Sequence, residues 1–222
     1  AVLRIVMPTA VQYVLEFGSF ALLTILIAAL SEVQMAAHQI ALQIIHFSFL
    51  PAFGIAEAVS VLAGQAVGAR RNALVYKVAR QGLVVAVAYT AACSLALGVG
   101  APWIVSGFTG DPALRSVAVA LLYVAALFQV FDGANMVARG ALRGAGDVRY
   151  PAVVGVVTAW LLTPPLTWLL GYHVGLGALG GWIGLCAEIV LGAAVLWWRL
   201  LGGAWARAAS ETRTALDPAA AE

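Results

Sequence analysis

The chain has 222 residues, of which 63% are hydrophobic and only 10% charged, with a formal net charge of +2. Charged residues make up about a quarter of ordinary soluble domains, so this composition excludes that class. Runs of about 20 mostly apolar residues recur along the chain, which is typical of helical membrane proteins, and the short alternating segments of a membrane β-barrel are absent. Cys93 and Cys186 lie in apolar runs without CxxC spacing, so no disulfide framework, zinc site or other cofactor is predicted.

The apolar runs predict an all-α integral membrane protein with six transmembrane helices. We expect spans at residues 5–30, 35–66, 78–100, 113–138, 150–171 and 177–200. These form one unit at 1–202, followed by a polar cytoplasmic tail at 203–222 that is expected to be disordered. Pro51 and the pair Pro164-Pro165 fall inside spans and are expected to kink them. The start at Ala1, with an apolar run beginning at once, predicts a fragment of a longer polypeptide; the alternatives are a trimmed chain and a complete half-transporter.

Lysine and arginine are distributed unevenly between the predicted loops. All twelve except Arg115 fall on one side of the predicted bundle. The positive-inside rule makes that side cytoplasmic, so we expect a multi-pass protein of the plasma or inner membrane with both termini in the cytoplasm. The basic loops lack the interleaved aromatic residues of a nucleic-acid surface. The lipid bilayer, and no nucleic acid, is therefore expected as a partner.

Four acidic residues are predicted to lie within spans: Glu16, Glu57, Asp132 and Glu188. An ionised acid costs several kcal/mol in hydrocarbon, at roughly 2.5–3.5 kcal/mol on insertion scales, unless it faces a partner or a watery cavity. For Glu16 and Asp132 we favour a function in binding or relaying H⁺ or Na⁺. Glu57 can instead reach the interface, and Glu188 is either a cavity residue or a partner for a helix outside this chain.

Polar residues accompany the acids at helical spacing. Gln129, Asp132 and Asn135 share one face of the fourth predicted helix. Gln39, Gln43 and His46 form a comparable stripe on the second. The functional interpretation is a cation-coupling and substrate cavity lined by Glu16, Asp132, Gln129, Asn135, Gln39 and Gln43, with Glu16 and Asp132 as a candidate Na⁺ site. The alternative is hydrogen bonding between packed helices, which we favour for Gln39, Gln43, His46 and Asn135, each taken singly.

Three stretches resemble the multidrug and toxic compound extrusion (MATE) family. One runs from Ala36-Ala37-His38-Gln39-Ile40-Ala41 through Pro51 and Gly54 to Gly64-Gln65-Ala66-Val67-Gly68-Ala69; another is Asp132-Gly133-Ala134 with the loop sequence Arg139-Gly140-Ala141-Leu142-Arg143-Gly144-Ala145-Gly146-Asp147; the third is Pro8 with Glu16. The resemblance implies a twelve-helix protein made of two six-helix lobes, of which this chain is similar to the C-terminal one. The partner it implies is the missing N-terminal lobe, or a second copy of the chain.

The resemblance also implies a function. MATE proteins are antiporters, not enzymes, that expel small cationic organic drugs while H⁺ or Na⁺ enters. Glu16 and Asp132 fall on positions whose acids are implicated in cation coupling. Phe128 stands where the Na⁺-coupled branch typically has tyrosine, and losing that hydroxyl oxygen favours H⁺.

Other functions stay open at this point. A lipid or lipid-linked oligosaccharide flippase of the wider superfamily typically needs cationic residues inside its cavity, and no Lys or Arg is expected in the middle of a span. A membrane-embedded enzyme could use Glu16 and Asp132 as an acid–base pair, but the chain lacks a metal-ligand cluster or an activated nucleophile. A non-transporting structural lobe is the third alternative, since one lobe cannot supply both walls of a transport cavity.

Overall fold

The computed structural model of the chain describes residues 2–216. Its elements are α1 (Val2–Ala28), α2 (Glu32–Gly68), α3 (Asn72–Ser106), α4 (Pro112–Gly144), α5 (Arg149–Leu166), the π-helix η1 (Thr167–His173), α6 (Ala178–Leu201) and α7 (Trp205–Leu216). Within these residues, six helical segments are long and apolar enough to cross a membrane, with α5 and η1 forming one of them. The predicted all-α, multi-pass membrane fold is confirmed.

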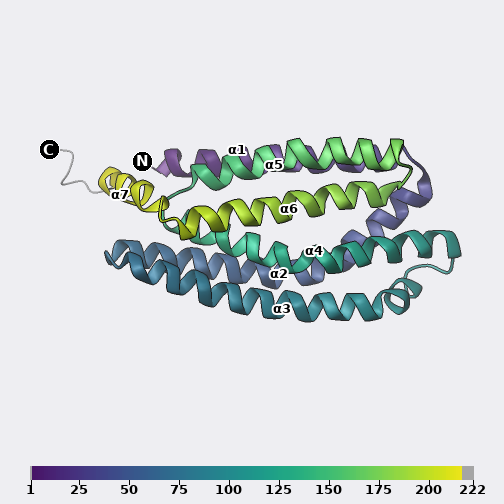
Figure 1. The fold of residues 1–222 in the computed structure, drawn as a ribbon, viewed down its shortest axis with the longest axis horizontal. Helices are drawn as coiled ribbons and strands as arrows, with labels where there is room; N and C mark the ends of the chain where they lie inside the picture. Colours follow the sequence, from purple (N-terminus) through teal and green to yellow (C-terminus); the bar gives the residue numbers. More distant parts are fainter. Residues whose placement is uncertain (1, 217–222) are drawn as a thin grey trace.

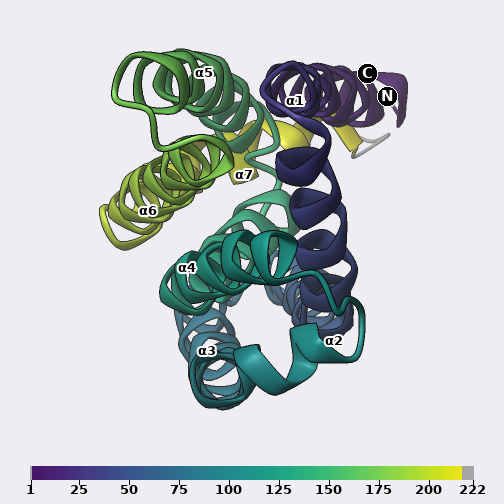
Figure 2. The same cartoon turned by 90° about the vertical axis from the view of Figure 1, so that its right-hand side faces the viewer.

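The six long segments form two groups of three (Figures 1 and 2). Helices α2, α3 and α4 pack together in one group, while α5 packs between α1 and α6 in the other. The groups are joined mainly by α4, which packs against α6. The beginning of α1, the α2–α3 and α4–α5 connections and α7 all lie at one end of the bundle (Figure 1). This end carries the basic segments that the sequence placed on a single side.

Helix α4 begins at a well-defined cap and runs further than predicted. The Asp111 side chain accepts a hydrogen bond of 2.9 Å from the Ala113 backbone N–H, and Pro112 occupies the first helical turn. The helix continues to Gly144, although the prediction ended it at residue 138. Basic residues such as those near 139 are typical of a cytoplasmic loop, which is why the sequence predicts an earlier end. Their positive charges are tolerated inside the helix because they pair with acids on neighbouring helices, as described below.

The α4–α5 connection holds the end of the motif that runs from Arg139 to Asp147, and the contacts of Gly146 and Asp147 are structural. The backbone N–H of Asp147 bonds to the carbonyl of Leu142, and Gly146 adopts a positive φ of 91°, which closes the end of α4. The buried Asp147 carboxylate accepts a 3.0 Å hydrogen bond from Arg199 of α6. The Arg199 guanidinium also lies 4.4 Å from the centre of the Tyr150 ring. This end of the motif therefore fixes the connection against α6.

The segment after α6 differs from the sequence prediction of a disordered tail at 203–222. Residues Trp205–Leu216 form helix α7, with the side chains of Trp205 and Ala209 buried. The indole N–H of Trp205 donates to the Leu200 carbonyl at 3.1 Å, and its ring meets Tyr76 of α3 edge-on. Polar composition gave no sign of this anchor. The remaining tail residues, 217–222, lie outside the described part of the chain.

Replacing Trp205 with alanine is expected to release α7 from the bundle. Removing a buried aromatic side chain costs about 3–5 kcal/mol, and each 1.4 kcal/mol is about tenfold in an equilibrium, so trypsin should cleave after Arg207 at least about tenfold faster. Limited proteolysis with mass spectrometry measures this. Trp103→Ala, which removes an indole that is already 73% exposed, is the matched control and should leave the cleavage rate unchanged.

Candidate functional site: an intramembrane cavity

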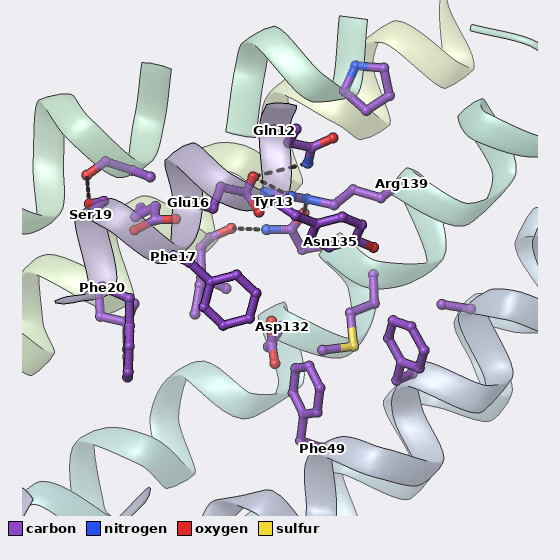
Figure 3. Close-up of a pocket in the computed structure, with 18 of the residues that line it drawn as sticks. Gln12, Tyr13, Glu16, Phe17, Ser19, Phe20, Phe49, Asp132, Asn135 and Arg139 are labelled. Atoms are coloured by element: carbon purple, nitrogen blue, oxygen red, sulfur yellow. Dashed lines mark hydrogen bonds and ion pairs between the residues drawn. The ribbon is translucent and has the colours of Figure 1, made fainter. Parts of the chain in front are cut away.

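A cavity of about 420 Å³ lies between the two helix groups, bounded by residues of α1, α2, α4, α5 and α6 (Figure 3). Its charged and amide lining residues are Gln12, Glu16, Asp132, Asn135, Arg139, Arg143 and Glu188, and Ser19, His46 and Thr163 also line it. Its aromatic lining residues are Tyr13, Phe17, Phe20, Phe49 and Phe53. Ligand sites are commonly apolar hollows with a few convergent polar groups, and this cavity has that character.

Glu16, on α1, is held by two hydrogen bonds. Arg139 of α4 donates from Nη1 to Glu16 Oε1 at 2.7 Å, forming an ion pair. The buried Gln12 amide, one turn earlier on α1, donates to the same oxygen at 3.0 Å. The two charged side chains are only about one-fifth exposed, at 21% for Glu16 and 19% for Arg139. In this structure the Glu16 charge is therefore matched by a protein cation.

Arg139 is itself fixed by its neighbours. Its Nε donates to Asn135 Oδ1 at 3.0 Å, and the Asn135 amide donates in turn to the Ile189 carbonyl of α6 at 3.4 Å. Gly155 of α5 supplies the space for the ion pair, because a Cβ at that position would overlap Glu16 Oε1 and lie 3.0 Å from both Nη atoms of Arg139. Four helices therefore position the pair.

The other two cavity acids are in different environments. Asp132 of α4 is half-buried and makes no hydrogen bond or ion pair with any described residue (Figure 3). Glu188 of α6 accepts a hydrogen bond of 2.5 Å from the Thr163 hydroxyl of α5. Across residues 2–216, no group of three His, Cys, Asp or Glu side chains is placed to hold a metal ion. The three acids share one cavity, but only Glu16 has a cationic partner.

Several residues that the sequence assigned to the cavity lie elsewhere. Gln129 is buried and donates to the Ser48 hydroxyl of α2, so it joins two helices instead of lining the cavity. Gln39 and Gln43 are exposed on α2, outside the cavity, although His46 of the same stripe lines it. Helical spacing put each stripe on one face, but the packing of α2 and α4 decides which part of that face meets the cavity. Phe128 is also outside it, buried against Trp182.

Glu57 belongs to a second polar cluster beside the cavity. Arg143 of α4 donates from Nη2 to Glu57 Oε1 of α2 at 2.5 Å. Its Nη1 donates to the Tyr13 hydroxyl of α1 at 3.0 Å. Glu57 does not line the cavity, and its side chain is 45% exposed. Arg143 thus links three helices at one margin of the site.

Arg139 and Arg143 are the functional candidates that sequence reasoning missed. The sequence predicts a loop at these residues and no arginine within a span, which argues against a flippase. That prediction is wrong, because both arginines line the cavity. A signal was present. Asp132, Asn135, Arg139 and Arg143 follow one another at three- or four-residue spacing, which continues the polar face of α4 into its last turns.

Comparison with known proteins gives consistent matches. A family model described as MatE matches residues 8–169. A probable multidrug resistance protein NorM from Xylella fastidiosa is 34% identical over 89% of this chain and 42% of its own length. A protein of the same name from Pseudomonas aeruginosa is 36% identical over 88% of this chain and 42% of its own length. The chain spans less than half the length of these curated relatives.

Solved structures show the same fold. The MATE transporter ClbM in complex with Rb⁺ superposes with a TM-score of 0.85 at 20% identity, over 93% of this chain and 48% of that one. The eukaryotic MATE transporter AtDTX14 gives a TM-score of 0.85 at 18% identity, over 97% of this chain and 48% of that one. The six-helix bundle thus corresponds to about half of each of these structures.

Proposed function

Because this chain belongs to the MATE family, we propose that it is one six-helix half of an antiporter that exports amphipathic organic cations in exchange for H⁺ or Na⁺. Family members are transporters, which removes the membrane-enzyme alternative. The observation that supports the proposal most directly is the convergence of Glu16 and Asp132, from different helices, on one cavity with aromatic walls.

The chemistry of the cavity suits a lipophilic cation. Phe49 and Phe53 of α2 stack with ring centres 6.1 Å apart, and Phe17 of α1 lines the same cavity as Asp132 (Figure 3). Aromatic faces attract cations, and a carboxylate in a medium of low dielectric constant attracts them strongly. A flat aromatic cation could therefore pack on the rings while its charge faces Asp132.

Coupling follows from the competition between two cations for the same acid. Binding of H⁺ or Na⁺ would neutralise Asp132, weaken its attraction for the drug and favour release, while the two lobes change between inward- and outward-facing states. One elementary charge moving inward gains about 2.3 kcal/mol per 100 mV. Hard metal ions need several oxygen ligands, and across residues 2–216 no group of three His, Cys, Asp or Glu side chains is placed to hold a metal ion, so H⁺ is the ion we favour.

The proposed orientation in the membrane follows from the distribution of Lys and Arg residues. The basic end of the bundle, which includes the α2–α3 connection and α7, would face the cytoplasm of a plasma or inner membrane. A second six-helix lobe, either the N-terminal half of the same polypeptide or another copy of this chain, would complete the cavity on the side where α1 and α2 expose aromatic residues.

Ethidium efflux tests the proposal. Cells without their own drug exporters would express the chain alone, or joined to the N-terminal lobe of a relative, and ethidium accumulation would be followed by fluorescence. We expect efflux from the joined protein that stops when the proton gradient is collapsed and persists without Na⁺. Ethidium accumulation equal to that of empty cells would reject drug export, and loss of efflux only without Na⁺ would assign the other ion.

A lipid flippase remains a second candidate because of one observation: Arg139 and Arg143 line the cavity, where a phosphate could meet them. Each of them, however, is already paired with an acid, Glu16 or Glu57. Translocation of a fluorescent phospholipid across vesicles containing the joined protein distinguishes the candidates. A flippase would move the lipid faster than protein-free vesicles, and a drug antiporter would not.

A further inference from the structure

Glu16 and Asp132, the two acids that the sequence singled out, differ in whether a positively charged side chain of the protein is paired with them. We propose that Arg139 is a positioning residue that acts as an internal counter-cation for Glu16, so that an incoming cation meets Asp132 first and reaches Glu16 only after Arg139 has moved away. This inference deepens the proposed function, and it rests on that function in taking the cavity as the place where cations bind.

Contacts with several neighbouring residues hold the Arg139 guanidinium against the Glu16 carboxylate. Its Nη1 lies 2.7 Å from the carboxylate, and its Nε is bound to Asn135 at 3.0 Å. Gly155 keeps α5 close enough to cover the pair without a side chain between them. Guanidinium groups stay protonated under all physiological conditions, so this partner cannot lose its charge and must move to free the acid.

Asp132 and Glu188 lack such a partner. Asp132 lines the same cavity with no ion pair to any described residue, and the charge of Arg139 acts on it only from a distance. Glu188 is bonded to a neutral hydroxyl, that of Thr163. The other cavity arginine, Arg143, is paired with Glu57, which lies outside the lining. In this conformation the negative charge available to a cation therefore lies at Asp132 and Glu188, not at Glu16.

The consequence is an order of events. A cation at Glu16 would have to replace a charge-assisted hydrogen bond, and while Arg139 stays in place its positive charge repels a second cation there. Asp132, Asn135 and Arg139 share one helix face. A shift of α4 against α1 would therefore break the Glu16–Arg139 ion pair and, at the same time, change the surroundings of Asp132. Glu16 then becomes a cation site in one conformation and an internal ion pair in the other.

Carboxyl labelling distinguishes acids that are protonated from acids that are held ionised in an ion pair. Dicyclohexylcarbodiimide reacts with protonated acids in apolar surroundings, and an acid ionised in an ion pair is protected. With the chain purified into lipid nanodiscs and the label located by mass spectrometry, we expect Asp132, which is free to bind H⁺, to react once it is protonated, and Glu16 to be protected. Arg139→Gln should raise labelling of Glu16 at least about tenfold, because a charge-assisted hydrogen bond is lost. Arg139→Lys, which keeps the charge, should restore most of the protection.

Arg143→Gln is the matched control. It removes an arginine from the same helix and breaks the Glu57 ion pair, so it should raise labelling of Glu57 and leave Glu16 protected. If Arg139→Gln does not fold, Gly155→Ala separates Glu16 from Arg139 by steric overlap without removing a charge, and it should also expose Glu16 to the reagent. Equal labelling of Glu16 and Asp132 in the unmodified chain, or equal effects of Arg139→Gln and Arg143→Gln on Glu16, would overturn the inference.

Binding of tetraphenylphosphonium separates this inference from the proposed function. Arg139→Gln should raise the affinity about tenfold, and Glu16→Gln alone should lower it, because Arg139 is then left in the cavity with an unmatched positive charge. The double variant Glu16→Gln with Arg139→Gln should bind about as well as the unmodified chain, because both charges of the pair are gone. Opposite effects of the two single variants, with restoration in the double variant, would not arise from a purely structural role of Arg139. If no variant binds the cation, drug export by this chain is contradicted. The labelling pattern still decides whether Arg139 is the counter-cation of Glu16.

Discussion

Replacing Asp132 with asparagine is expected to abolish coupled export while leaving the fold intact. Asparagine has nearly the same volume, and Asp132 makes no hydrogen bond or ion pair that the fold would lose in the described structure. A unit charge about 4 Å away contributes about 4 kcal/mol at the effective dielectric constant of a protein surface, which exceeds a tenfold change in affinity. The joined protein carrying this substitution should accumulate ethidium as empty cells do, at an unchanged expression level.

Asp111→Asn provides the control for this substitution. It makes the same chemical change on the same helix, at the exposed N-terminal cap of α4. Asparagine caps helices as well as aspartate does, so stability and export should both be retained. Full ethidium export by the Asp132→Asn protein would remove Asp132 from the coupling mechanism, whatever the control shows.

Gly144→Ala is expected to separate α4 from α2 and to lower the thermal stability of the lobe. A Cβ at Gly144 would overlap the backbone carbonyl of Ser60, and one at Gly140 would overlap that of Ala56. Backbone atoms cannot rotate away as a side chain would, so the helices themselves must move. Overpacking of this kind costs about 1–3 kcal/mol, or several degrees in the unfolding temperature at about 2–4 °C per kcal/mol for a chain of this size.

Other glycines in the same bundle supply the control. Gly54 of α2 and Gly98 of α3 have open space where a Cβ would be placed. Alanine at either position should be neutral or slightly stabilising, because glycine is a poor helix former. Thermal unfolding in detergent, followed by circular dichroism, compares these three variants with the unmodified chain. An unfolding temperature for Gly144→Ala equal to that of Gly54→Ala would show that α2 and α4 are not held at this distance.

These two expected results concern the same helix. Helix α4 carries Asp132, Asn135, Arg139 and Arg143 along one face. It carries Gly140 and Gly144 where it packs against α2. A displacement of α4 would therefore shift all of the polar groups that it brings to the cavity. We expect export to fall in Gly144→Ala even where enough folded protein remains to measure it.

Part of the site was predictable because its signals are local. An acid within an apolar run is recognisable from the sequence, since its desolvation cost does not depend on knowing the neighbours. Glu16, Asp132 and Glu188 were identified in this way, and the structure brings all three to one cavity. The cationic partner of Glu16 was not predictable. Arg139 lies 123 residues further along the chain, and only packing places it there.

The sequence by itself determined the membrane character, the six spans and the acids of interest, because span length and the cost of buried charge are properties of single segments. The tertiary structure alone decided that Gln129 joins two helices while Asn135 faces the cavity, that Arg139 occupies Glu16 and that Trp205 anchors α7. The physical reason is that lipid tails are as apolar as a packed interior. The hydrophobic pattern of a membrane helix therefore does not distinguish its lipid-facing side from its packed side, and only the neighbouring helices fix its rotation.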